Sequence, residues 1–434
     1  MEKKPLKWLK IDNSARIYPM LYGKKTQNIF RISCELDREV DPDVLTRALT
    51  DILPRYPSFN VKMRKGFFWY YFEENSKPPL VFFDGDVKID NIDFAKNNSY
   101  IFRTTYFNRV FSIDFYHSVT DGRGGSEFIK ALLLRYLELI GCDVDGEGIV
   151  KPYNSPPTKG EIEDSFLNNY RPVPIKDIEL KGFLGGRGYV VKGVPLDDSE
   201  CGIINGLAET SEIKRVAKKY GVTVTAYLGG LFMYSIYKTN YDGEYDKRPI
   251  KLMIPVNLRK IFPSKTLRNF TFALMAEAPA TGGEPTLGYF VECVAAQLKK
   301  GLEPKSIATK VAGSVKLDKN LLVKLLPLPI KFAVFRAGQS IIRKISGNTA
   351  VLTNPGIIEM PESVKPYLKH MSMVLIPIKD ASTTCAVLTY NGEMSLTFSR
   401  RHKDVEIVRE FFGEMVREGL KFTLTSNYAE TKVE

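Results

Sequence analysis

Between residues 111 and 140 the spacing of apolar side chains changes from that of a strand to that of a helix, and His117 lies where the change begins. Apolar and polar side chains alternate from Phe111 to Tyr116, which is the period of a half-buried strand, and His117 continues on the apolar side. Asp121 and Gly122 then favour a tight turn. An apolar stripe with helical spacing follows at residues 128, 132, 133, 136 and 140. The pattern predicts a strand, a turn and a helix, with the His117 imidazole held rigidly where they join.

The segment from His117 to Gly122 reads H-x-x-x-D-G. It resembles the signature of the coenzyme A-dependent acyltransferases related to chloramphenicol acetyltransferase, a superfamily that includes alcohol acetyltransferases and the condensation domains of peptide synthetases. The resemblance implies that His117 is the general base and that Asp121 holds the turn through a salt bridge to an arginine. Condensation domains usually carry a second histidine at the position of Tyr116, so this tyrosine argues against a condensation domain more than against acyl transfer.

Three further segments carry the resemblance, in the order in which the superfamily has them. The first is Asp41 to Leu49, which has the pattern of a capped helix preceding the strands that lead to His117. The second is Pro255 to Arg259, which is followed by Asn269-Phe270, and the third is the T-N-P-G turn from Thr353 to Gly356. Taken alone, the second segment fits a strand that ends in an exposed arginine equally well, and the third fits a plain Asn-Pro turn.

The resemblance also implies roles for residues in these segments. The Thr353 hydroxyl lies near the reacting carbonyl and is the candidate donor to the oxyanion. Arg259 is the first candidate for the partner of Asp121, and Arg16 and Arg31 remain alternatives. The candidate catalytic residues are therefore His117, Asp121, Gly122 and Thr353, and the candidate substrate-binding residues are Tyr116, Asn257, Arg259 and Asn354.

The chain is long enough for two packed cores. It has 434 residues, of which 44% are hydrophobic and 26% are charged. Prolines and glycines gather between residues 151 and 193, which indicates a connection, so we expect domains at 1–165 and 196–434 joined by a linker at 166–195. With the resemblance, this predicts an α/β (α+β) protein of two chloramphenicol acetyltransferase-like domains. Each domain would be a mixed β-sheet with flanking helices, and the active site would lie at their interface.

Three runs in the second domain predict one antiparallel set of strands. They are Val374 to Ile378, Cys385 to Tyr390 and Met394 to Ser399. Asn391-Gly392 lies between the last two runs, and this dipeptide favours the type I′ turn of a tight hairpin.

The chain carries a net charge of +12 at pH 7, which attracts anions. Nucleic acid is not the expected anion, because Lys and Arg are scattered along the chain rather than clustered with aromatic residues. This charge would attract the phosphates of coenzyme A. A basic surface that contacts only solvent and has no binding partner explains the charge as well. The five cysteines form no C-x-x-C pair and indicate neither a disulfide framework nor a metal site.

Residues 321 to 336 are rich in leucine and basic side chains, as an interfacial helix would be. Pro327 and Pro329 interrupt any continuous helix, so we favour a hydrophobic cover over an acceptor channel, or a packed helix pair, over membrane contact. No run of about 18 uncharged apolar residues occurs, and stable membrane insertion is not expected. The N-terminal residues lack the apolar stretch of a secretory signal, which predicts a cytoplasmic protein.

Together these observations predict an O- or N-acyltransferase. Its donor would be a coenzyme A thioester, with acetyl-coenzyme A (acetyl-CoA) as the first candidate, and its acceptor a hydroxyl or an amine. A condensation-type acyltransferase would use the same histidine with a donor bound to an acyl carrier protein. A non-catalytic protein that binds a thioester or a hydrophobic ligand is the remaining alternative. No metal is expected.

Overall fold

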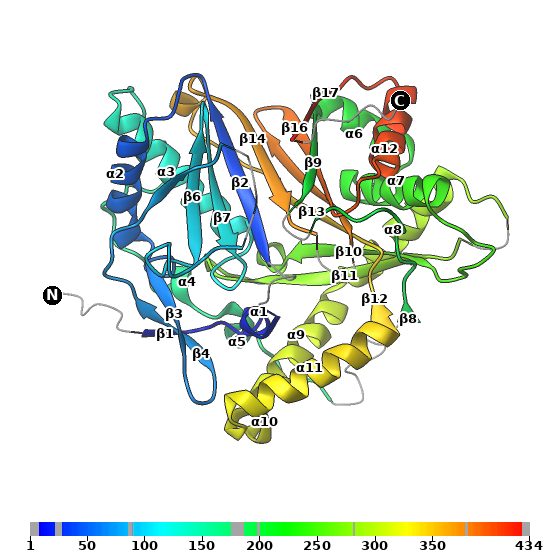
Figure 1. Ribbon diagram of the computed structural model, residues 1–434, viewed down its shortest axis with the longest axis horizontal. Coiled ribbons are helices and arrows are strands. Elements are labelled where there is room, and N and C mark those ends of the chain that lie inside the picture. Colours follow the sequence, from blue (N-terminus) through cyan, green and yellow to red (C-terminus); the bar gives the residue numbers. More distant parts are fainter. Residues whose placement is uncertain are drawn as a thin grey trace.

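The protein contains two large β-sheets, and helices pack against each of them (Figure 1). The architecture comes from a computed structural model. It describes residues 8–21, 28–85, 89, 91–174, 186–197, 200–280, 283–377 and 381–427. Within these ranges, none of the helices has the length and apolar character needed to cross a membrane.

The first sheet has five strands and carries the helices α2 (Pro42–Ile52) and α3 (Gly122–Leu139). In spatial order its strands are β14 (Leu368–Leu375), β2 (Ile29–Leu36), β7 (Val110–Tyr116), β6 (Phe102–Phe107) and β5 (Val81–Phe83). The central strand β7 pairs antiparallel with β2 and β6. Phe115 of β7 packs against Phe128 of α3, so the strand and helix predicted around His117 meet in one core.

The second sheet has seven strands. In spatial order they are β11 (Thr271–Ala278), β10 (Ile250–Asn257), β13 (Ala350–Ile357), β15 (Thr383–Tyr390), β16 (Glu393–Arg400), β9 (Gly202–Glu209) and β17 (Thr423–Ser426). β13 runs parallel to both of its neighbours, and the other pairs are antiparallel. The helices that pack against this sheet are α6 (Thr210–Lys219), α7 (Val224–Thr239), α8 (Leu287–Gly301) and α12 (Glu406–Arg417).

The remaining elements are shorter or lie beside the two sheets. Two small sheets are formed by β1 (Trp8–Lys10), β4 (Tyr70–Glu74) and β3 (Val61–Lys65), and by β8 (Gly186–Arg187) and β12 (Ser346–Gly347). The other helices are α1 (Ile17–Leu21), η1 (Leu53–Arg55), α4 (Lys159–Ile162), α5 (Ser165–Asn168), η4 (Leu258–Lys260), α9 (Pro304–Lys319), α10 (Leu321–Leu325), α11 (Leu328–Ile345) and η5 (Glu362–Val364).

The predicted class, an α/β protein of mixed sheets with flanking helices, is confirmed. The hairpin turn is confirmed too, because Asn391 and Gly392 have φ values of 46° and 82°, as a type I′ turn requires. The predicted antiparallel set is wrong in its first strand. β15 pairs with β16 as predicted, but the run from Val374 to Ile378 overlaps a strand only at Val374 and Leu375, the end of β14, and β14 pairs with β2 in the first sheet. Ile378 lies outside the described residues. The alternation of apolar and polar residues shows which side chains of a strand face a hydrophobic core. It does not show which of the two sheets the strand joins.

The predicted division into domains at 1–165 and 196–434 stays a prediction. The residues of β14 fall in the predicted second domain, but this strand pairs with β2 in the first sheet. The two sheets therefore do not coincide with the two predicted sequence ranges. Of the predicted linker at 166–195, residues 175–185 lie outside the described residues.

Candidate active site

His117 lies directly after β7, where the chain turns toward α3. Its backbone N–H donates to the Asn28 carbonyl at 2.8 Å, which ties the turn to the residue before β2. Asp121 is the N-cap of α3, and its Oδ1 accepts the Gly124 N–H at 3.1 Å. The turn is therefore held on both sides of the histidine, and the imidazole has a fixed place.

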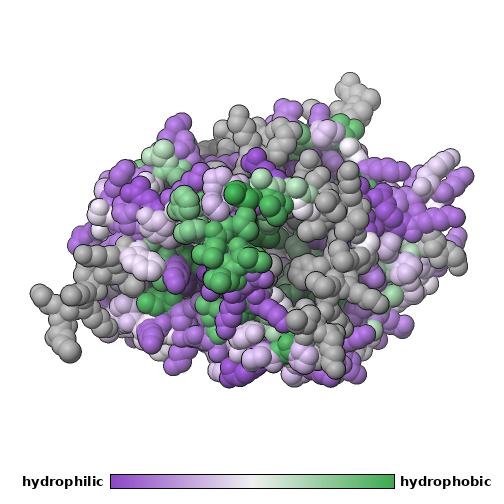
Figure 2. Space-filling view, turned by 90° about the horizontal axis from the view of Figure 1, so that it is seen from below, coloured by the Kyte–Doolittle hydropathy of each residue, from purple (hydrophilic) through white to green (hydrophobic). Residues whose placement is uncertain are grey.

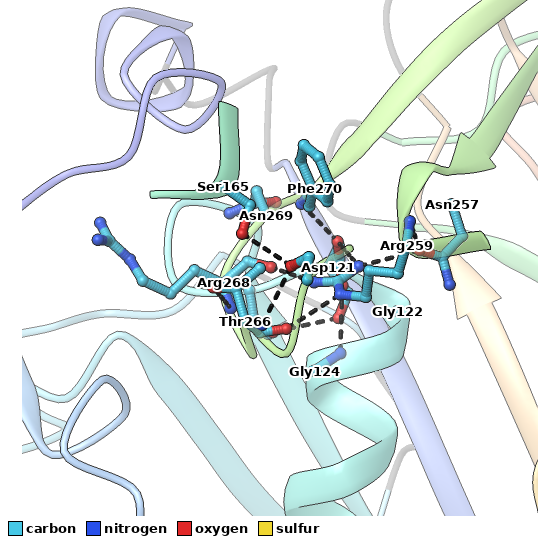
Figure 3. Close-up of polar contacts among 12 residues, drawn as sticks. Asp121, Gly122, Gly124, Ser165, Asn257, Arg259, Thr266, Arg268, Asn269 and Phe270 are labelled. Atoms are coloured by element: carbon cyan, nitrogen blue, oxygen red, sulfur yellow. Dashed lines mark hydrogen bonds and ion pairs between the residues drawn. The ribbon is translucent and has the colours of Figure 1, made fainter. Parts of the chain in front are cut away.

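The Asp121 carboxylate joins this turn to the loop between β10 and β11. Its Oδ2 accepts from Arg259 Nη1 at 2.8 Å and from the Phe270 N–H at 2.7 Å (Figure 3). The side chains of Asp121 and Arg259 are 1% and 9% exposed. Because both charges are buried, removing either one would leave the other without its partner.

Arg259 is thus the arginine that pairs with Asp121, and the two alternatives are engaged elsewhere. Arg31 holds Asp114, with Nε 2.6 Å from Oδ1. Arg16 pairs with an aspartate at the end of α9. The structure therefore resolves the choice among the three arginines that the sequence left open.

Asn269 fixes the tautomer of His117. Its Nδ2 donates to the His117 carbonyl at 3.0 Å, and its Oδ1 lies 3.0 Å from His117 Nδ1. A backbone carbonyl can only accept, so the amide nitrogen must face it and the amide oxygen must face Nδ1. Nδ1 therefore carries a proton, and Nε2 of the neutral ring has a free lone pair.

Two aromatic rings contact the His117 imidazole. Tyr18 of α1 stacks on it with ring centroids 4.6 Å apart, and Phe30 of β2 meets it edge on at 5.2 Å. Burial lowers the pKa of His117 below its ordinary 6.5, although hydrogen bonds to the ring and the charge of Asp121 act in the opposite direction. The site thus keeps the imidazole neutral at pH 7, as a proton acceptor must be.

We expect the His117 ring to titrate below pH 6.5, because burial disfavours its charged form. Tyr18→Ala removes the stacked ring and admits water, so the midpoint should move up toward 6.5. Proton NMR of the histidine ring resonances measures both midpoints. The midpoint of His402, which lies just beyond β16, should be the same in the two proteins. A wild-type midpoint above 6.5 would contradict this description of the site.

The loop between β10 and β11 also closes over the first turn of α3. Thr120 Oγ1 donates to the Leu267 carbonyl at 2.6 Å. A Cβ added to Gly124 would stand 1.9 Å from Leu267 O and 2.2 Å from Thr120 Oγ1, which is far too close. A Cβ added to Gly122 would meet its nearest atoms at 3.6 Å, an ordinary contact. The glycine that packing requires is therefore Gly124, rather than the Gly122 of H-x-x-x-D-G.

Gly124→Ala should destabilise the protein by about 1–3 kcal/mol, because the added methyl must displace the loop or the helix. Gly122→Ala, two positions earlier in the same helix, is the matched control and should change stability by less than about 1 kcal/mol. Urea unfolding of the two variants and the wild type gives both differences. Equal effects of the two substitutions would show that the close approach at Gly124 relaxes without cost.

Thr353 and Asn354 belong to β13, at a point where its register with β15 shifts. Asn354 Oδ1 accepts the Gly356 N–H at 3.0 Å, and its Nδ2 donates to a threonine hydroxyl of α7 at 3.1 Å. Pro355 lies beside the start of α3, since a Cβ on Gly122 would be 3.6 Å from Pro355 Cβ. The segment from Thr353 to Gly356, predicted as a turn, is therefore an irregular part of a strand, and it lies beside the helix that follows the His117 turn.

Like Arg259 and Asn354, the other two predicted substrate-binding residues have contacts inside the protein. Tyr116 is fully buried and packs against Phe94, on the face of β7 opposite His117. Asn257 Oδ1 accepts from the Arg259 N–H at 3.0 Å and from Arg259 Nη1 at 3.2 Å. The structure thus does not bring Tyr116 to the imidazole, and it gives Asn257 a role in holding Arg259.

Sequence reasoning missed the contacts of Asn269 and Tyr18 with His117. The sequence carries a signal for Asn269, because the resemblance includes an asparagine after Pro255 to Arg259. Its two bonds to His117 depend on how the loop folds back. No sequence pattern links Tyr18 with the histidine.

Comparisons with known proteins define the class of fold. No protein-family model matches the chain, and no curated protein matches it. TRI3 trichothecene 15-O-acetyltransferase from Fusarium sporotrichioides is 11% identical with a TM-score of 0.61, over 96% of this chain and 98% of that one. TRI101 from F. graminearum, solved with coenzyme A and deoxynivalenol, is 11% identical with a TM-score of 0.61, over 96% and 99%. The nonribosomal peptide synthetase FmoA3 is 14% identical with a TM-score of 0.62, over 95% of this chain and 42% of that one.

The chain therefore has the fold of the acetyltransferase TRI3 and of TRI101, and this fold is also found in part of the peptide synthetase FmoA3. The predicted resemblance is confirmed for the fold. Because one fold can carry several activities, the function has to follow from the site.

Proposed function

We propose that the protein is an acyltransferase that moves an acyl group, most simply acetyl, from coenzyme A to a hydroxyl or an amine. The observation that carries the proposal is the pair of contacts between His117 and Asn269. These contacts leave Nε2 as the basic nitrogen of a neutral imidazole. A general base needs this state.

Direct transfer needs no covalent intermediate on the protein. Nε2 of His117 takes the proton of the acceptor O–H or N–H while the acceptor atom attacks the thioester carbonyl. The tetrahedral intermediate then collapses and the carbon–sulfur bond breaks. The imidazolium returns its proton to the leaving sulfur, so the products are an ester or amide and coenzyme A with a free thiol.

Thr353 is the proposed donor to the oxyanion of this intermediate. The observation that supports this role is the closeness of its strand segment to the start of α3, where a Cβ on Gly122 would lie 3.6 Å from Pro355 Cβ. Losing one such donor costs about 2.7–4 kcal/mol of transition-state stabilisation. Asp121 is proposed to hold the turn rather than to react, because its carboxylate is bound to Arg259 and to two backbone N–H groups.

Coenzyme A is the proposed donor because a protein of the same fold was solved with it bound. TRI101 was solved with coenzyme A, and TRI3 is an O-acetyltransferase by name. The net charge of +12 also favours a donor that carries a pyrophosphate and a ribose phosphate.

A thiol-release assay tests this proposal. Acetyl-CoA is offered with a panel of alcohols and amines, and free thiol is measured for the wild type and for His117→Ala. We expect release that requires both an acceptor and the histidine. Acetyl-CoA should also raise the melting temperature, because a ligand that binds only the native state stabilises it. Absence of both effects at millimolar acetyl-CoA would overturn a free coenzyme A donor.

A donor attached to an acyl carrier protein is the second candidate. The likeness to FmoA3, a peptide synthetase, favours it, and a basic surface suits an acidic carrier. This candidate predicts transfer from an acylated carrier protein and none from free acetyl-CoA. A melting shift without transfer from either donor would instead identify a binding protein.

A further inference from the structure

Seven large apolar side chains are exposed together at one end of the molecule. They lie on the turn between β3 and β4 and on the helices α10 and α11, at the bottom of Figure 1. The exposed fraction reaches 70% for Phe67 and 76% for Leu322. Figure 2 shows apolar side chains gathered on this face. This apolar patch consists of Phe67, Phe68, Leu321, Leu322, Leu325, Ile330 and Val334.

Polar contacts beneath the apolar patch hold its parts in place. The Leu328 N–H donates to the Phe67 carbonyl at 2.9 Å. Lys331 Nζ donates to the Phe68 carbonyl at 2.9 Å and to the Lys324 carbonyl at 3.2 Å, and it lies 3.8 Å from the centre of the Trp69 ring. The backbone groups of the turn and the two helices are thus tied to one another while their apolar side chains point outward.

For residues 321 to 336, the sequence favoured a hydrophobic cover over an acceptor channel or a packed helix pair. Pro327 does separate α10 from α11, as expected, but Pro329 lies in the first turn of α11 and does not interrupt that helix. The packed pair is not observed for α10, because none of its residues is buried. Its leucines therefore face solvent, where apolar side chains grouped in this way mark an interaction surface.

The segment that carries most of the apolar patch is strongly basic. Residues 304 to 345, which include α9, α10 and α11, hold nine Lys and Arg against one Asp, so they supply eight of the twelve net positive charges of the chain. The one acidic residue, Asp318, is paired with Arg16. Lys319, Lys324 and Arg336 are exposed next to the patch.

We infer that the apolar patch docks the protein on an anionic lipid surface. Leucine and phenylalanine side chains enter the boundary between headgroups and acyl chains, and lysines and arginines beside them meet the lipid phosphates. A second copy of the chain fits this surface less well, because two such faces would bring their positive charges together. The inference concerns binding alone and does not depend on acyl transfer.

Vesicle sedimentation tests the inference with the whole protein. The probes are phosphatidylcholine vesicles with and without phosphatidylglycerol, at low and high salt. We expect binding to the anionic vesicles that salt weakens. Leu322→Glu and Lys324→Glu should each lower the partition coefficient about tenfold or more.

Matched controls lie at the far end of the molecule, near β17 (Figure 1). Leu424 is 54% exposed there, and Lys421 is exposed as well. Leu424→Glu and Lys421→Glu repeat the same chemical changes and should leave vesicle binding unchanged. All four side chains are exposed, so the variants should keep the wild-type melting temperature.

Three results would overturn the inference. One is a wild-type protein that binds no vesicle, and another is equal binding to neutral and anionic vesicles. The third is an equal loss of binding in Leu322→Glu and Leu424→Glu. Self-association that Leu322→Glu abolishes, without any vesicle binding, would assign the apolar patch to a second copy instead.

Discussion

His117→Ala should lower the turnover of acyl transfer about a hundredfold to ten thousandfold, the usual contribution of a positioned general base. The substitution removes the proposed proton acceptor, Nε2, which is the ring nitrogen left without a proton when Nδ1 donates to Asn269. The fold and donor binding should persist. Thermal unfolding and acyl transfer are therefore measured on the same preparations of both proteins.

A histidine with a purely structural role would give a different pattern. Activity would then fall only as far as the amount of folded protein falls. His402→Ala provides a control with another partly buried histidine and should leave turnover close to that of the wild type. Near wild-type rates in a well-folded His117→Ala protein would overturn the proposed mechanism.

Asp121→Asn should destabilise the fold by about 3–5 kcal/mol, the usual cost of breaking one side of a buried ion pair. It leaves the Arg259 guanidinium buried beside an uncharged amide, where the carboxylate oxygen lies 2.8 Å away in the wild type. Since the carboxylate also accepts the N–H groups of Gly124 and Phe270, the start of α3 loosens from the β10–β11 loop. Activity should fall together with stability, and urea unfolding measures the latter.

Asp37→Asn is the matched control, because it makes the same chemical change in an exposed pair. The side chains of Asp37 and Arg38 are 26% and 43% exposed. Such a pair is worth at most about 1 kcal/mol, so this variant should unfold close to the wild type. A stable Asp121→Asn protein that loses only the chemical step would mean that Asp121 takes part in the reaction.

Local features of the site could be predicted from the sequence, because each depends on neighbouring residues. The alternation before His117 places it at the end of a strand, and the helix after Asp121 follows from the apolar spacing. The Asn391-Gly392 turn is local in the same sense.

Features that depend on how distant segments meet could not be predicted. Three arginines were possible partners of Asp121, and only the β10–β11 loop selects Arg259. The pairing of β14 with the first sheet depends on the meeting of two halves of the chain. Likewise, the motif contains Gly122, whereas the close approach of the Leu267 carbonyl makes Gly124 the position where a larger residue cannot fit.

The pH dependence of kcat/KM for acyl transfer tests the central claim most directly. The base works in its neutral form, and burial lowers the pKa of His117 below 6.5. In the wild type, kcat/KM should therefore rise with pH through a midpoint below 6.5 and stay level from there to neutral pH. The residual rate of His117→Ala should lack this midpoint. A midpoint that persists in His117→Ala, or a wild-type rate that falls as pH rises through this range, would contradict the assignment of His117 as the base.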